Sequence, residues 1–187
     1  MAARRKERMV AMLKRDNRMV DIQVVNALLR SGRFFASTAI LIIAGLLAVL
    51  GATERAIALV MDLPFTVPTS REVWEAKILF MILVFIYAFF NFVWLMRQYN
   101  YCSILVGAAP AASELPEDFG SIATLASLAA KHSNRGIRAY YFGLAALGWF
   151  VHPWLLLGAA VWVVLVLYRR EFSSCTKRLV HGQSVAQ

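Results

Sequence analysis

The sequence predicts an all-α integral membrane protein: a bundle of about four transmembrane helices with amphipathic helices on the cytoplasmic side. Three observations indicate this class. Hydrophobic residues make up 60% of the 187 residues and charged residues only 17%, and the mean hydropathy is +0.60. The apolar residues gather into long blocks, and the basic residues are concentrated in alternate segments between them. A soluble domain is nearer about half apolar and about a quarter charged, so a bilayer is the expected solvent.

We expect a single membrane domain over residues 1–187, beginning with a basic cytoplasmic arm at 1–33. This arm carries nine Lys and Arg residues against three acidic ones. From Asp16 to Gly32 the apolar residues recur at helical spacing, which predicts an amphipathic helix on a membrane surface or a partner. Nucleic-acid binding would use the same charge. Positive segments beside spans are routine in membrane proteins, so we expect no nucleic-acid partner.

The first predicted span, 34–51, contains no charged residue. At about 1.5 Å per residue it crosses most of a hydrocarbon core of about 30 Å. It follows too long a charged region for a cleaved secretory signal, so we interpret it as an uncleaved anchor. Ala44, Ala48 and Ala52 lie four residues apart, a pattern that lets a second helix approach closely.

A charged connector at 52–77 precedes the second predicted span, 78–96. The connector holds seven charged side chains, and its prolines Pro64 and Pro68 disfavour continuous helix. Ser70 is a suitable N-cap for the helix that follows.

A line of polar and aromatic side chains marks the second span and its continuation. Its members recur at helical spacing and form the candidate interhelical or pore face: Tyr87, Asn91, Trp94, Gln98 and Tyr101. A buried amide in lipid is costly unless it is paired. Asn91 is therefore expected to face the bundle and to hydrogen-bond with Ser37, Thr38 or a second copy. We interpret this amide as a group that hydrogen-bonds between helices rather than as a reactive group.

Residues 113–119 have the composition of a helix start, with a proline and acidic side chains in the first turn. They predict a short amphipathic helix that ends near Lys131 and His132. Asn134 and Gly136 are then expected to break the chain.

Residues 139–168 carry no formal charge when His152 is neutral. As one helix they would measure about 45 Å, which is longer than one span needs. Two short spans, 139–152 and 154–168, with a hairpin at Pro153 are therefore preferred over a single kinked helix.

The distribution of basic residues supports four spans with both termini inside. Seventeen of the 20 Lys and Arg residues then fall in inner segments, including the tail 169–187. Three fall outside: Arg55, Arg71 and Lys77. The positive-inside rule places both termini of this multi-pass chain in the cytoplasm.

The sequence offers few groups for catalysis or metal binding. His132, His152 and His181 are scattered, and the two cysteines belong to no metal or redox motif. No Gly-rich phosphate loop, GxSxG elbow or HExxH motif occurs. Apart from Arg97 at one margin, no predicted span holds a charged group, which argues against a proton-coupled carrier. We therefore expect no catalytic residue, no metal, no cofactor and no enzymatic activity.

Four motifs carry a resemblance to a known family: Phe90 to Tyr101 with its WxxRQxNY run, Gly107 to Pro110, Arg135 to Phe142, and Tyr168 to Phe172. They resemble small multi-span membrane proteins of bacteria and plants that are known only as a domain of unknown function, DUF599. The resemblance covers about Asn17 to Ser174. It implies a helical membrane protein and brings no activity, cofactor or catalytic residue. The location that we expect is the bacterial inner membrane. In the family pattern a lysine can replace Asn91, which weakens a catalytic role for the amide.

Three functions fit these observations. The preferred one is a structural or accessory membrane subunit that forms a homo-oligomer or joins a larger membrane complex, because catalytic groups are missing while small-residue rows and amphipathic helices are present. The first alternative is a passive channel or transporter lined by the Tyr87, Asn91 and Gln98 side of the candidate face. The second alternative is an anionic-lipid-binding protein or membrane enzyme, with these candidate headgroup contacts: Arg97, Arg135 and Arg138.

Overall fold

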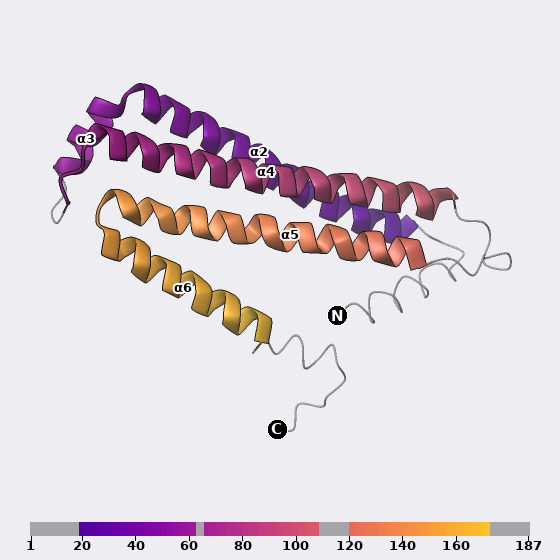
Figure 1. Ribbon diagram of the computed structural model, residues 1–187. Helices are drawn as coiled ribbons and strands as arrows, with labels where there is room; N and C mark the ends of the chain where they lie inside the picture. Colours follow the sequence, from indigo (N-terminus) through magenta and orange to yellow (C-terminus); the bar gives the residue numbers. More distant parts are fainter. Residues whose placement is uncertain (1–18, 63–65, 109–119, 173–187) are drawn as a thin grey trace. The chain divides into compact units, whose positions relative to one another are not determined.

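The computed structural model describes residues 19–62, 66–108 and 120–172, and within these ranges the regular structure is helical, without a strand. Figure 1 labels the α-helices: α2 (Met19–Gly51), α3 (Thr53–Met61), α4 (Arg71–Ala108), α5 (Gly120–Ala146) and α6 (Pro153–Phe172). The short 3-10 helix η2 (Leu147–Phe150) lies between α5 and α6. The predicted all-α class is confirmed.

Helix α2 joins the described part of the predicted amphipathic segment, from Met19 onward, and the predicted span 34–51 in one continuous helix. Gly32 lies inside it, although glycine in a helix costs about 0.5–1 kcal/mol relative to alanine. A Cβ at this position would lie 2.6 Å from Cδ2 of Leu95 on α4. The glycine therefore allows the two helices to approach closely.

The predicted connector, 52–77, contains a helix that its composition did not suggest, α3. The chain has no regular structure at 66–70, after the first proline, and α4 begins at Arg71. The expected helix start is therefore found directly after Ser70. The backbone carbonyl of Ser70 accepts a hydrogen bond of 3.0 Å from the N–H of Trp74.

The chain divides into two compact units, each assembled from separate stretches of sequence. Unit 1 takes its residues from Met1–Ile40 and Tyr87–Ile137, and unit 2 from Leu41–Ile86 and Arg138–Gln187. The described part of unit 1 holds the first part of α2, the second part of α4 and most of α5. Unit 2 holds the remaining parts of these helices together with α3, η2 and α6.

Unit 2 is centred on the first turns of α4. Trp74, Ile78 and Ile82 are buried and form a cluster with apolar side chains from α2, α3 and η2. The Trp74 ring meets the Phe150 ring edge to face, with centroids 4.7 Å apart, an arrangement that aromatic pairs favour. This contact fixes η2 against α4.

Lys77 is buried in the same unit, with only 5% of its surface exposed. Its Nζ donates a hydrogen bond of 3.1 Å to the carbonyl of Trp149 and lies 5.3 Å from the centroid of the Trp149 ring. The carbonyl and the ring replace part of the water shell that a buried ammonium loses. Lys77 thus links α4 to η2.

The predicted break at Asn134 and Gly136 is wrong, because α5 runs through both residues. A Cβ at Gly136 would lie 2.6 Å from Cε2 of Phe92 on α4. Gly136 is therefore a contact point between two helices of unit 1 rather than a helix end. The predicted helix start at 113–119 lies outside the described residues.

Residues 139–168 do not form one long helix. α5 ends at Ala146, η2 follows, and α6 begins at Pro153, where a proline is well tolerated in the first turn of a helix. The N–H of His152 donates to the carbonyl of Gly148 at 3.1 Å. The chain reverses direction here (Figure 1), as the predicted hairpin requires.

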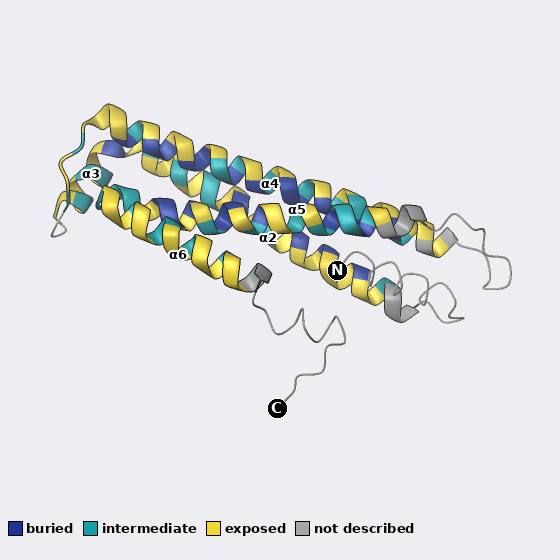
Figure 2. Cartoon of the chain, turned by 60° about the horizontal axis from the view of Figure 1, so that its bottom comes forward, coloured by how far each residue is buried: buried dark blue, intermediate teal, exposed yellow. Residues whose placement is uncertain are grey.

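By length and composition, two helical segments of the described chain are suited to cross a membrane: Ile22–Gly51 and Arg71–Leu105. Pro153–Arg169 is apolar but shorter. Most of α6 is exposed (Figure 2), as is much of α2. Two helices of membrane-spanning length are therefore present in the described residues, and the topology with four spans stays a prediction.

Candidate functional site

A group of polar and aromatic side chains in unit 1 joins α4 to α5. We call it the amide–aromatic cluster, and its members are Asn91, Trp94, Arg97, Tyr101 and His132. The first four come from α4, where the helix turns them toward one side at intervals of three or four residues. His132 comes from α5 and connects the two helices.

Asn91 is the buried member, with 6% of its surface exposed. Its Nδ2 donates a hydrogen bond of 2.8 Å to the backbone carbonyl of Tyr87, and its Oδ1 lies 3.3 Å from Nδ1 of His132. Because Nδ2 is engaged with a carbonyl, Oδ1 is the acceptor that faces the histidine. This network assigns the proton of the neutral imidazole to Nδ1.

The partner of Asn91 differs from the partners expected from the sequence. The hydroxyl of Thr38 donates instead to the carbonyl of Phe34 in its own helix, at 2.8 Å, and Ser37 is exposed. The bond between helices that was expected of this amide is present, but His132 supplies it. The sequence analysis missed His132 because it assigned this residue to the end of a short helix outside the bundle, followed by a break.

The predicted polar line divides into two rows. Tyr87, Trp94 and Tyr101, which lie seven residues apart, are exposed by 53%, 46% and 45%. Asn91 and Gln98 are also seven residues apart, and seven residues make nearly two full helical turns, so they share a second face of α4. This face is less exposed, because Asn91 is buried and Gln98 is partly buried. The side-chain oxygen Oε1 of Gln98 is buried without a hydrogen-bond partner among the described residues.

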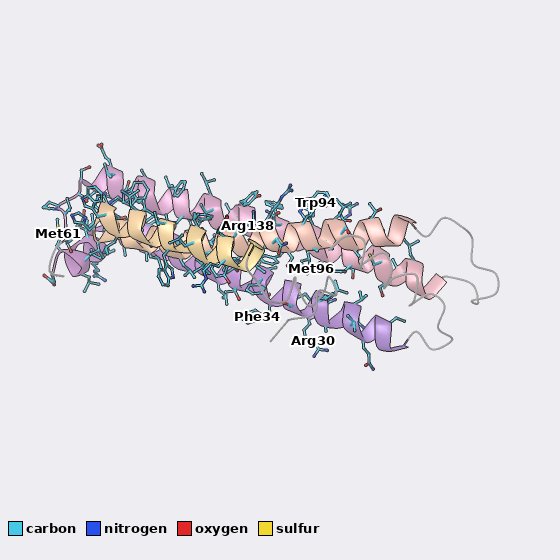
Figure 3. All side chains as sticks on the ribbon, turned by 90° about the horizontal axis from the view of Figure 1, so that it is seen from below. Arg30, Phe34, Met61, Trp94, Met96 and Arg138 are labelled. Atoms are coloured by element: carbon cyan, nitrogen blue, oxygen red, sulfur yellow. The ribbon has the colours of Figure 1, made fainter. Side chains whose placement is uncertain are left out.

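Arg97 lies between two aromatic rings of its own helix. Its Nε donates to the Tyr101 hydroxyl at 3.1 Å. Its Cζ is 5.4 Å from the Trp94 ring centroid and 5.7 Å from the Tyr101 ring centroid. These distances are typical of cation–π contacts. Trp94, which projects from α4 (Figure 3), thus holds the guanidinium beside it.

The other side of Trp94 faces α5. The His132 ring stacks on the Trp94 ring, with centroids 6.5 Å apart and planes inclined by 24°. Burial lowers the pKa of His132, and the charge of Arg135 lowers this pKa further. At neutral pH the histidine is therefore uncharged, while two guanidinium groups lie near the Trp94–His132 pair.

The three predicted headgroup contacts belong to different parts of the structure. Arg97 and Arg135 are exposed in unit 1. Arg97 contacts the Trp94 ring, and the charge of Arg135 lowers the pKa of His132. Arg138 is exposed in unit 2.

A cavity of about 50 Å³ lies in unit 1 beside Phe92. Its polar lining comes from Ser31, Tyr99 and Ser133, and the rest is mainly apolar. Tyr87, Asn91 and Gln98, the predicted channel face, do not line it. Within the described ranges no three His, Cys, Asp or Glu side chains come together in a way that could hold a metal ion.

Over its described residues, the chain is a helical protein with two helices of membrane-spanning length and a partly buried amide–imidazole pair. The chain belongs to the DUF599 family, described as "Protein of unknown function, DUF599", whose model matches residues 1–176. The resemblance inferred from the sequence motifs is thereby confirmed. No curated protein and no solved structure matches the chain.

Proposed function

We propose that this protein is an integral membrane protein that acts as a structural or accessory subunit, by associating with a second copy or with a larger membrane complex. The observation that carries the proposal is the exposure of α2. Only 11% of its most apolar window is buried. A soluble protein of this composition would bury its apolar helix, because each square ångström of apolar surface left in water costs about 25 cal/mol.

The side chains of α2 show what this exposure means. Phe34 and Leu41 are exposed by 66% and 72%. Lipid tails or the helix of another subunit would remove these surfaces from water, and α2 is long enough to cross a bilayer. Ala44 and Ala48, four residues apart and exposed on α2, offer a place where such a helix can approach closely, whereas Ala52, the third member of the predicted row, lies beyond the end of α2.

Helix α6 supports the same proposal. From Pro153 to Arg169 none of its side chains is buried. Trp154 and Trp162 are exposed by 74% and 69%. An apolar helix without a buried side chain gains little from the packing of its own chain, so it needs lipid or a partner as its surroundings.

The proposed topology has four spans, with both termini in the cytoplasm of a bacterial inner membrane. The support is the concentration of Lys and Arg in the segments that this topology places inside. The proposed partners are the bilayer and another membrane subunit, and neither nucleic acid nor an enzymatic substrate is part of the proposal. The channel alternative has less support, because Asn91 already bonds to the Tyr87 carbonyl and to His132.

Two measurements test this proposal. Alkaline carbonate extraction of membranes should leave the full chain in the membrane pellet, and its release into the supernatant would refute membrane insertion. Native mass spectrometry after mild solubilisation should show a homo-oligomer or a co-purifying membrane subunit. A lone monomer in lipid nanodiscs as well as in detergent would refute the role in association while leaving insertion intact.

A further inference from the structure

The guanidinium of Arg97 is held in place but lacks a carboxylate partner among the described residues. Ion pairs are present elsewhere in these ranges, between Arg71 and the carboxylates of Glu54 and Glu75. Within the described part of the chain, Arg97 makes the hydrogen bond from Nε to the Tyr101 hydroxyl and its two ring contacts. Its Nη groups therefore keep their N–H donors for another acceptor.

The rings fix the position of these donors. Trp94 precedes Arg97 by three residues and Tyr101 follows it by four, so both rings flank the guanidinium on one helix surface. A guanidinium that is stacked and hydrogen-bonded before a ligand arrives loses less conformational freedom when the ligand binds. Arg97 is thus prepared for an acceptor that takes two parallel N–H bonds.

The charge around the cluster favours an anion. The described ranges of unit 1 contain five Lys and Arg residues and one acidic residue. Arg135 acts on His132, whose ring stacks on Trp94. Two cationic side chains therefore lie near the same aromatic pair, and phosphate is the anion whose oxygens match a guanidinium in a bidentate arrangement.

The length of α4 indicates at which depth of the membrane Arg97 and its flanking rings lie. Its 38 residues measure about 57 Å, well beyond a hydrocarbon core of about 30 Å. If the predicted span 78–96 occupies the core, Arg97 is the first residue beyond it. That level is where the phosphates of phospholipids lie, and where tryptophan and tyrosine are enriched.

We propose that Arg97, flanked by Trp94 and Tyr101 and assisted by Arg135, binds the phosphate of an anionic ligand, with an anionic phospholipid as the expected source. This inference rests on the proposed membrane insertion and adds a ligand class to it. Arg97 donates through Nη1 and Nη2, the rings keep the guanidinium in position, and Arg135 adds positive charge. Phosphate diesters of lipids and soluble phosphate esters share this chemistry, so the test must separate them.

The test uses the full chain in nanodiscs that contain phosphatidylcholine with a minor share of phosphatidylglycerol, and native mass spectrometry of the lipids retained after release. The wild type should retain phosphatidylglycerol in preference to phosphatidylcholine. Arg97→Gln should reduce this preference about tenfold, because a bidentate charged hydrogen bond is lost. Arg97→Lys, which keeps the charge but not the planar fork, should fall between the two.

Arg55→Gln is the matched control, because Arg55 is exposed in unit 2 and its loss changes the net charge by the same amount. It should keep the wild-type preference. Equal losses in Arg97→Gln and Arg55→Gln, or no loss in either, would overturn the proposal. If Arg97→Gln does not fold, Tyr101→Phe replaces it, since it removes only the hydroxyl that holds Nε. A wild-type preference in Tyr101→Phe would then count against the site.

A soluble competitor distinguishes the two sources of phosphate. Inorganic phosphate or glycerol phosphate at millimolar concentration should leave phosphatidylglycerol bound, which supports a lipid site. Displacement of the lipid supports a phosphate site and overturns the lipid as its source. The outcome is separate from that of the proposed function: a chain that resists carbonate extraction but shows no lipid preference refutes the phosphate site alone.

Discussion

The close approach of Gly136 to Phe92 predicts that Gly136→Ala destabilises unit 1. The added Cβ would lie 2.6 Å from Cε2 and 2.7 Å from Cζ of Phe92. The Phe92 ring is 1% exposed and stacks on Phe35, with centroids 5.1 Å apart and planes inclined by 14°. Because the ring is buried and stacked on Phe35 of α2, moving it away from the methyl group would disturb its packing against α2.

Two opposing effects set the magnitude. Overpacking a filled core costs about 1–3 kcal/mol, while replacing glycine by alanine in a helix gains about 1 kcal/mol. Gly136→Ala should therefore lower the free energy of unfolding by about 0–2 kcal/mol. Gly158→Ala on α6 is the matched control, because nothing lies within 4 Å of its added Cβ. This variant should gain stability, so the two should differ by about 1–3 kcal/mol.

Reversible unfolding by SDS titration in mild detergent, followed by circular dichroism, measures this difference. The variant Phe92→Leu offers a further check, because a smaller side chain leaves room for the methyl group. In that background the cost of Gly136→Ala should shrink by at least about 0.5 kcal/mol, as expected for residues in contact. If Gly136→Ala and Gly158→Ala change stability equally, the close packing inferred at Gly136 is wrong.

Three further predictions concern the polar groups. Asn91→Leu should lower the free energy of unfolding by about 1–3 kcal/mol in the same titration, because it leaves the Nδ1 proton of His132 without its acceptor. A change below about 0.5 kcal/mol would show that this hydrogen bond contributes little. Lowering the pH should destabilise the wild type, because the pKa of His132 is below its ordinary value of 6.5 in the folded state. The unfolded chain takes up the proton first, so this stability is present above about pH 6.5 and is lost as the pH falls toward the folded pKa. His132→Gln should lose this acid-sensitive component, and an unchanged pH profile would contradict the assignment. Lys77→Ala should cost about 1–3 kcal/mol, since it removes the donor to the Trp149 carbonyl, whereas Arg55→Ala at an exposed position should change stability by less than about 0.5 kcal/mol.

The helical class and the start of α4 could be read from the sequence because they depend on local signals. Long apolar blocks and a suitable residue before Arg71 are enough to predict them. The family could be read as well, because the WxxRQxNY run is contiguous. The direction of the Asn91 side chain toward a second helix follows from the cost of burying an amide.

The identity of the neighbouring helix could not be read in the same way. Helical periodicity shows which side chains share a face, but it does not show which other helix meets that face. Gly136 has the appearance of a helix breaker because its local propensity is poor, yet its contact with Phe92 places it inside α5. That error separated His132 from Asn91, and the pair became visible only when α4 and α5 were seen together.

The bond between Lys77 and the Trp149 carbonyl has a consequence for biosynthesis. The two residues are 72 positions apart in the chain. At a translation rate of about 5–20 residues per second, Lys77 is synthesised about 4–14 s before Trp149, whose carbonyl is the acceptor of its hydrogen bond. Until then the ammonium has water as its main source of hydrogen bonds. Burial of Lys77 is therefore a late event in assembly, and a nascent chain that stops before η2 would keep this charge hydrated.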